Sequence, residues 1–199
     1  MPKISAPTVA EHRAKQHKQV LDAALRYIVE HEGDVPTLGE VAKDVGLARS
    51  SVYQYVSSRA DLMGQLLIML MEEWAAAVSK EMEQVEASSG KHGAALANAK
   101  LSAYVRTTLD LFADGTRHAM MVAASKVPSV FEDARVLCAH NVMRPELVAI
   151  LEKAGLPKGE AEAYADLVDT ATHRAAEMIA QGVEREDVIA SLDRMIRLS

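Results

Sequence analysis

The sequence predicts an all-α protein. Three observations support this prediction: the composition, the spacing of the apolar residues, and the breaks at glycine and proline. Aromatic residues make up only 4% of the 199 residues, although 49% are hydrophobic. Straight-chain side chains lose little rotamer freedom in a helix, whereas aromatic residues suit strands better. No segment alternates between apolar and polar residues with the period of two that a strand requires. We therefore expect about nine helices and no internal repeat.

Three segments are expected along the chain. Residues 1–10 carry two prolines and no periodicity, and we expect a flexible arm there. Residues 11–57 are predicted to form a small three-helix unit. Residues 58–199 are predicted to form a larger helical unit, which begins with a long helix that is apolar nearly all round and therefore needs protein on every side.

Charge is distributed unevenly between these segments. Up to Ala60 there are 8 Lys and Arg residues against 7 Asp and Glu, whereas the remainder has 14 against 21. The whole chain has a formal net charge of −6. A polyanionic partner is therefore expected to meet the N-terminal third.

The single cysteine and the hydropathy pattern exclude several classes of protein. Cys138 alone forms no intramolecular disulfide and no multi-cysteine metal site, and we expect it to be buried as a small hydrophobic residue. No apolar run approaches the ~18 residues of a membrane span, and the N-terminus lacks the apolar centre of a signal peptide. We expect a cytoplasmic protein without a membrane partner, a metal or a cofactor.

The motif that indicates function lies between Leu38 and Val56. Thr37 and Glu40 have the spacing of a capping box, and Ser58 with Asp61 repeats it at the next long helix. Two short helices that meet at a sharp angle need a small residue at the close approach, a residue tolerant of positive φ at the turn, and apolar residues inside the angle. Ala42 is the small residue and Gly46 is the turn residue. The apolar residues inside the angle are Val41, Val45, Leu47 and Val52. The pattern is typical of a helix-turn-helix that places its second helix in the major groove of DNA.

The outward face of the second short helix supports this interpretation. No acidic residue occurs from Ala48 to Ala60, which is unusual for a solvated surface of an acidic protein and expected for a face that meets DNA. The alternative is an ordinary helical hairpin inside a core.

This region resembles the tetracycline-repressor-like (TetR) family of regulators. The resemblance covers roughly residues 16–66, including the run from Thr37 to Val56 and the start of the next helix at Ser58. Val56 and Ile28 stand where the family commonly has phenylalanine, and Arg59 replaces its usual lysine.

The resemblance implies a role for each matching polar residue. Thr37 and Arg59 would hold phosphates at helix starts, where free amides favour an anion. Lys18 would add a phosphate contact, with solvation as the alternative. Bases would be read by guanidinium, amide and hydroxyl groups, Arg for guanine and Gln for adenine. The residues predicted to contact bases or backbone on the second helix are Arg49, Ser50, Ser51, Tyr53, Gln54 and Tyr55.

A dimer is expected, because one such module buries little DNA and specific binding needs two about one helical turn apart, ~34–36 Å. The resemblance places the dimer contact on the last two long helices, and the alternative is that their apolar stripes pack inside one subunit. The predicted interface residues are Ala165, Val168, Ala171, Ala175, Met178, Val188, Leu192 and Met195.

The middle helices are expected to enclose a small-molecule effector, mostly hydrophobic because no basic cluster occurs there. The predicted pocket residues are inward-facing aromatic, sulfur-containing or sparsely polar side chains, and ordinary core packing is the alternative for each. They are Trp74, Tyr104, Thr108, Met120, Met121, Phe131, Cys138 and Asn141.

The sequence therefore predicts a transcriptional repressor that binds a palindromic operator as a homodimer and is released by its effector. Catalysis is not expected, because the chain has neither a glycine-rich phosphate loop nor a Glu-x-x-His pair. The remaining alternative is an architectural or co-regulatory helix-turn-helix protein that has no effector.

Overall fold

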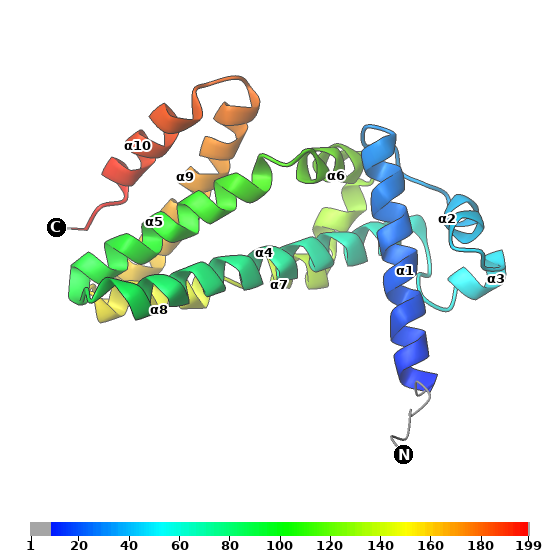
Figure 1. Cartoon of the computed structure of the whole chain (residues 1–199), viewed down its shortest axis with the longest axis horizontal. Coiled ribbons are helices and arrows are strands. Elements are labelled where there is room, and N and C mark those ends of the chain that lie inside the picture. The colour runs from blue at the N-terminus through cyan, green and yellow to red at the C-terminus, as the bar shows by residue number, and fades with distance from the viewer. Residues whose placement is uncertain (1–8, 199) are drawn as a thin grey trace, which may run out of the picture. The chain divides into compact units, whose positions relative to one another are not determined.

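The computed structural model describes residues 9–198, which form ten α-helices, one 3-10 helix and no strand (Figure 1). The all-α prediction is confirmed, with one α-helix more than expected. Residues 9 and 10 of the predicted arm already belong to the first helix, and residues 1–8 lie outside the described residues. The elements are α1 (Val9–Glu30), α2 (Leu38–Asp44), α3 (Arg49–Val52), α4 (Arg59–Ser89), α5 (Gly93–Phe112), α6 (Gly115–Ser125), η1 (Pro128–Glu132), α7 (Ala134–His140), α8 (Arg144–Lys153), α9 (Lys158–Ala180) and α10 (Arg185–Met195).

The chain divides into two compact units. The N-terminal unit contains the residues up to Ile68 together with His118–Val136, and the C-terminal unit contains Met69–Arg117 together with the residues from Leu137 onward. This division differs from the expected boundary at residue 57, because the segment 118–136 packs with helices that precede it by some 90 positions. Sequence periodicity carries no information about such a long-range contact.

The N-terminal unit buries the apolar stripes of four helices. Val20, Ala24 and Ile28 of α1 are fully covered, and α1 packs on α2, which packs on α3. Each of these stripes follows the helical spacing of i, i+4, so one face of each helix is inside. The other buried apolar residues of these helices and the turns between them are Leu21, Ala23, Val35, Leu38, Val41, Ala42, Val52, Val56, Leu62, Met63, Leu66 and Leu67.

Gly33 allows α6 to lie directly against the end of α1. Its φ is +90°, and a Cβ atom there would lie 2.6 Å from Cγ1 of Val122 and 2.9 Å from the backbone oxygen of Ala119. A side chain at this position is therefore excluded both by conformation and by space. Two ion pairs join the segment 118–136 to earlier residues of the same unit. Lys126 pairs with Asp34 at 2.6 Å, and Arg135 pairs with Asp61 at 3.1 Å.

The C-terminal unit is a helical bundle in which α9 packs on α5, α8 and α10. Its core combines the inward stripe of the second half of α4 with those of the four other helices. Tyr104 and Leu101 of α5 are completely buried there, as is Leu151 of α8. Because α4 starts in one unit and ends in the other, its apolar residues contribute to both cores.

Among the described residues, α4 alone has the length and composition of a membrane-spanning helix. Its most apolar 18-residue window has a mean hydropathy of 1.2, so the expectation that no apolar segment approaches the length of a membrane span is not met. The core helix of a water-soluble protein passes the same test, and 44% of that window is buried inside the structure. Leu62, Met63 and Leu66 are among the covered residues, which gives α4 an ordinary role in packing.

Candidate functional site

The turn between α2 and α3 has the geometry that the sequence predicts. Gly46 has a φ of +70°, the left-handed conformation that side chains disfavour. The Leu47 amide donates to the Ala42 carbonyl at 2.9 Å, and Ala42 is 3% exposed. Val52 and Val56 are buried below the turn, so α3 is held by its apolar side and leaves its polar side outward.

A capping box fixes the start of α2. The Thr37 hydroxyl accepts from the Glu40 amide at 3.2 Å, and the Glu40 carboxylate accepts from the Thr37 amide at 2.7 Å. The hydrogen bond from the Thr37 backbone lowers the pKa of Glu40. The Thr37 side chain adds a second hydrogen bond that lowers the pKa of Glu40, so the capping box keeps this carboxylate ionised at the start of α2.

The predicted second capping box is only half formed. The Ser58 hydroxyl accepts from the Asp61 amide at 3.0 Å, as expected. The Asp61 carboxylate reaches one residue further back and accepts from the backbone amide of Ser57 at 2.8 Å. The start of α4 is therefore capped by Ser58 alone, while Asp61 accepts from both the amide and the hydroxyl of Ser57.

The exposed face of α3 is polar and has no acidic residue. Arg49 and Ser50 of α3 are exposed, and Ser51 is half-buried. Tyr53 and Gln54 are exposed too, but they lie in the turn that follows α3, because the helix is shorter than the sequence predicts and ends at Val52. The Arg49 guanidinium lies 6.0 Å above the Tyr53 ring and donates to its hydroxyl at 3.4 Å. These groups are hydrogen-bond donors at the surface, which suits phosphate oxygens and base edges.

Three other predicted contact residues already have hydrogen-bond or ion-pair partners within the chain. The Tyr55 hydroxyl donates to Gln16 at 2.7 Å, so this tyrosine packs on α1 beside α3. The Arg59 guanidinium donates to the Val35 carbonyl at 2.7 Å, and Lys18 pairs with Asp22 at 2.9 Å. Sequence reasoning missed Arg13, which donates to the Gln54 carbonyl at 3.4 Å.

Three of the predicted effector residues lie together in the core of the C-terminal unit. The Trp74 indole donates to the buried Thr108 hydroxyl at 2.9 Å, and the ring meets Tyr104 edge-on with centroids 6.0 Å apart. The Tyr104 hydroxyl donates to Asp169 at 2.7 Å. Burial and the charge of Asp169 raise the pKa of Tyr104. Neither Asp169 nor its neighbour His173 was predicted, because a surface pair one helical turn apart is the simpler interpretation of their spacing.

Of the other five predicted effector residues, Asn141 lines a small cavity beside this cluster and the other four do not. Met120 is buried, but in the N-terminal unit. Met121 is 47% exposed and Phe131 44% exposed, and Cys138 and Asn141 are exposed too. The prediction that Met121, Phe131 and Cys138 face inward is therefore wrong, as is the prediction of a buried cysteine. Helices as short as η1 and α7 have too few turns for their apolar spacing to identify the inner face.

The C-terminal unit has a very small cavity beside Trp74. It measures about 20 Å³ and is also lined by Asn141, His140 and Asp169. That volume holds about one water molecule. A ligand of drug size requires this region to open.

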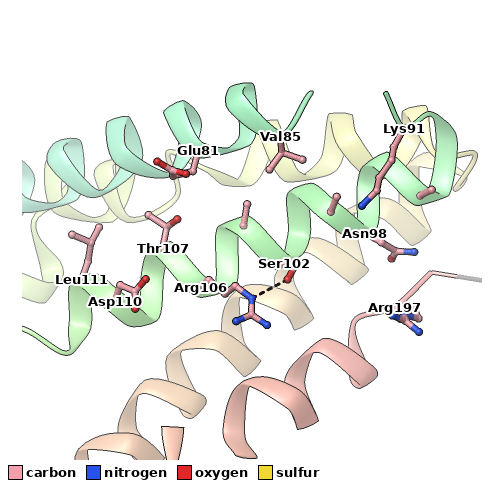
Figure 2. A pocket seen from close by; sticks show the side chains of 13 residues that line it. Glu81, Val85, Lys91, Asn98, Ser102, Arg106, Thr107, Asp110, Leu111 and Arg197 are labelled. Carbon is pink, nitrogen blue, oxygen red and sulfur yellow. Dashed lines mark hydrogen bonds between the residues drawn. The ribbon is translucent and has the colours of Figure 1, made fainter. Parts of the chain in front are cut away.

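A much larger groove of about 870 Å³ runs along α5 (Figure 2). Figure 2 shows Glu81 and Val85 on one side and Arg197 near the C-terminal end of the chain on the other. Arg106 donates to Ser102 at 3.4 Å within the groove, and its guanidinium also pairs with Asp193 at 2.9 Å. None of the predicted effector residues lines this groove, and charges of both signs do.

A third hollow, of about 670 Å³, lies between α9 and α10. Leu167 is 69% exposed and Met195 71% exposed at its edge. Some of the predicted dimer-interface residues are instead buried within the single chain. This agrees with the alternative that the apolar stripes of these helices pack inside one subunit. The buried members are Ala165, Val168, Ala175, Val188 and Leu192, and the accessible ones are Ala171, Met178 and Met195.

No group of His, Cys, Asp and Glu residues within 9–198 has the arrangement needed to hold a metal ion.

Known proteins share the fold of this chain but little of its sequence. No protein-family model matches the sequence, and no curated protein does. The TetR-like transcriptional regulator LfrR from Mycobacterium smegmatis, solved with proflavine, is 20% identical with a TM-score of 0.57 over 93% of this chain and 96% of its own. The fatty acid degradation regulator FadR from Bacillus halodurans is 15% identical with a TM-score of 0.63 over 92% and 94%. A transcriptional regulator from Rhodococcus sp. Rha1 is 22% identical with a TM-score of 0.58 over 90% and 93%. The chain therefore has the fold of TetR-like regulators.

Proposed function

We propose that this chain, which has the fold of TetR-like regulators, is a sequence-specific DNA-binding transcriptional regulator. The observation that carries the proposal is the polar surface beyond the Gly46 turn, where Arg49 on α3 and Gln54 in the turn that follows α3 are both exposed. A guanidinium can bond guanine O6 and N7, and a carboxamide can bond adenine N6 and N7. No acidic residue from Ala48 to Ala60 repels the phosphates on either side.

Binding to DNA is proposed to require a homodimer, formed by the exposed apolar surface of α9 and α10. Leu167 and Met195 are large apolar side chains that one chain alone leaves in water. Covering an apolar surface contributes about 25 cal/mol per Å². Two copies related by a two-fold axis would present two α3 helices to a palindromic operator.

The proposed effector is a small, mostly apolar molecule that enters the core around Trp74 and Tyr104. The cavity there holds about one water as it stands, so the effector would bind a more open conformation and increase its population. A structurally similar regulator was solved with proflavine bound, which supports a small-molecule ligand as a class.

The proposed route from effector to DNA passes through α4 and the segment 118–136. This segment belongs to the same compact unit as the helix-turn-helix and contacts residues on either side of it, Gly33 and Asp34 before it and Asp61 after it. A change of tilt in α4 beyond Arg59 would alter the separation of the two α3 helices and release the operator. Such coupling is typically worth 1–3 kcal/mol. We therefore propose a repressor that acts in the cytoplasm.

Selection of bound duplexes from random DNA tests this function most broadly. The expected result is a discrete sequence with two-fold symmetry. Coverage without sequence preference would instead support an architectural protein, and no retained DNA would contradict both interpretations.

The effector is tested separately by thermal unfolding in the presence of a panel of apolar and aromatic compounds, followed by operator titration with any compound that stabilises the protein. We expect at least one compound to raise the melting temperature and weaken operator binding about tenfold, the effect of 1.4 kcal/mol. A confirmed ligand that leaves operator affinity unchanged would contradict the proposed release.

A further inference from the structure

The groove along α5 is a cavity that is already open in the folded chain. It measures about 870 Å³, whereas the cavity beside Trp74 measures about 20 Å³. Sites for small molecules are usually preformed clefts of about 300–1,000 Å³. All residues that line the groove belong to the C-terminal unit, and none of them lines the cavity beside Trp74. The groove therefore has the size of a ligand site that is separate from the proposed effector core.

Hydrogen bonds between α5 and the end of the chain build one wall of the groove. The Asn98 amide donates to the Leu198 carbonyl at 3.0 Å, and its oxygen accepts from the Leu198 amide at 2.7 Å. Further along α5, the Ser102 hydroxyl donates to Asp193 of α10 at 3.1 Å. These bonds join positions far apart in the sequence, and they bring Arg197 into the lining of the groove.

The side of the groove formed by α5 includes a row of small apolar side chains. Ala95, Ala99 and Ala103 line the groove at the spacing of four residues that places them on one face of the helix. Val85 of α4 and Leu111 line it as well. These side chains suit the uncharged middle of an elongated ligand.

The charges that have no partner in the chain are separated along the groove. Figure 2 shows Lys91 and Arg197 toward one end of the groove and Glu81 toward the other, near Thr107. Within residues 9–198, the side chains of Lys91, Arg197 and Glu81 form no ion pair and no hydrogen bond. Two positive charges at one end and one negative charge toward the other are therefore free to pair with a ligand.

The other two charged side chains of the groove are compensated by α10. Arg106 pairs with Asp193 at 2.9 Å, and Asp110 pairs with Arg185. Their charges join α10 to α5, so the pattern that a ligand meets is set mainly by the three unpaired groups.

The separation of the opposite charges sets the length of the ligand. Asn98, which holds the chain end that carries Arg197, precedes Thr107 by nine residues, a rise of about 14 Å along α5. An extended polypeptide spans about 3.3–3.6 Å per residue, so four residues cover about the same length. A tetrapeptide with free termini carries its carboxylate and its ammonium group at about that separation.

We propose that the groove along α5 is a second ligand site, which takes an elongated zwitterion about as long as an extended tetrapeptide. Its anionic group contacts Lys91 and Arg197, and its cationic group contacts Glu81. The two charged points also set the orientation, because the reversed ligand places like charges together. The inference goes beyond the proposed function and does not rest on it, since every group involved belongs to the C-terminal unit.

Titration of the full chain with tetraalanine tests the site. The peptide is used with free termini, with an acetylated N-terminus and with an amidated C-terminus, so each block removes one charge. Correlation spectra of the backbone amides report binding along α5 and at Arg197. Free tetraalanine is expected to give saturable shifts there, and either block is expected to weaken binding about fivefold, the effect of one partly exposed ion pair.

Matched variants assign the charges of the ligand to the two ends. Lys91→Ala with Arg197→Ala is expected to weaken binding of free tetraalanine about tenfold. The control, Lys153→Ala with Lys158→Ala, removes the same charge from two exposed lysines outside the groove and is expected to keep the wild-type affinity. Glu81→Gln is expected to remove the difference between the free and the acetylated peptide, because that difference depends on the ammonium group.

All variants are expected to keep the wild-type melting temperature. Absence of saturable shifts up to about 10 mM free peptide would overturn the inference. Equal binding of the blocked and free peptides would do the same, since the site would then recognise neither charge. An equal loss in the lysine control would also overturn it, because net charge would then explain the effect. None of these results bears on DNA binding, which the duplex selection measures separately.

Discussion

The helix-turn-helix and the last two helices both carry side chains that the sequence assigns to a partner, but they are stabilised by contacts of different range. In α2 and α3 the decisive interactions join residues a few positions apart, such as the cap of Thr37 on Glu40 and the conformation of Gly46. In α9 and α10 the inner face is set by packing on other helices of the bundle. One of these is α5, which lies far earlier in the sequence than either. The polar face of α3 is therefore determined locally, whereas the free face of α9 is determined by the whole bundle.

This difference explains why the sequence pattern identifies the exposed face of α3 but not the exposed face of α9. The exposed residues of α3 are those that the pattern identifies, because only one side of that helix is apolar. α9 has apolar residues on two sides, Val168 and Ala175 toward the core and Leu167 toward solvent. Periodicity identifies both sides and does not tell which is covered by the same chain.

The largest expected effect concerns the core of the C-terminal unit. Trp74→Ala is expected to lower the free energy of unfolding by about 3–5 kcal/mol, because it opens a cavity and leaves the Thr108 hydroxyl without its indole donor. Urea unfolding followed by circular dichroism measures it. A loss below about 1 kcal/mol would mean that the bundle is not held by this long-range packing.

The next effect separates the covered and free faces of α9 and α10. Leu167→Asp with Met195→Asp is expected to weaken self-association by about 100-fold, since two carboxylates would have to be buried in the contact. Analytical ultracentrifugation measures it. The control is Leu137→Asp on α7, a leucine 50% exposed, which is expected to leave self-association intact. If both variants weaken self-association to the same extent, the assignment of the dimer contact to α9 and α10 is contradicted.

A smaller effect tests the local control of the helix-turn-helix. Gly46→Ala places a side chain at a φ of +70° and is expected to destabilise the protein by about 1–2 kcal/mol. The matched control is Gly39→Ala inside α2, where the nearest atom to a new Cβ is the Thr37 hydroxyl at 3.8 Å. Alanine is the better helix former, so this variant is expected to gain up to about 1 kcal/mol. Thermal unfolding of both variants should therefore give opposite signs, and equal signs would contradict the assigned turn.

The smallest effect concerns the contact between α6 and the end of α1. The hydrogen bond and charge of Lys126 lower the pKa of Asp34, so their contribution to stability is present above the unfolded pKa and is lost as pH falls through the folded value. The loss occurs below about pH 4. The difference in melting temperature between the wild type and Lys126→Met should shrink from pH 7 to pH 3. A constant difference would show that this pair does not hold the segment.

Local chemistry was predictable from the sequence, and long-range packing was not. The cap at Thr37, the turn at Gly46 and the buried Val52 and Val56 follow from residue type and spacing, and the structure has each of them. The contact of Gly33 with Val122 joins positions that share no motif. Sequence reasoning had no signal for it.

Pocket residues were the least predictable part of the candidate site. Trp74 and Tyr104 were identified because a large aromatic side chain on a helical stripe is buried in most contexts. Met121 and Phe131 are equally apolar and lie at the surface, since their short helices are covered on another side. Residue type alone did not separate these two cases.

The central claim, that the exposed side chains of α3 and of the turn after it read base sequence, is tested most directly by one comparison of affinities. Wild type and the double variant Arg49→Ala with Gln54→Ala are titrated with the duplex obtained by selection and with a random-sequence duplex of equal length. Each lost bidentate base contact costs about 1–3 kcal/mol of discrimination, so the preference for the selected duplex should fall at least tenfold while random-duplex affinity changes far less. An unchanged preference in the variant would contradict the claim.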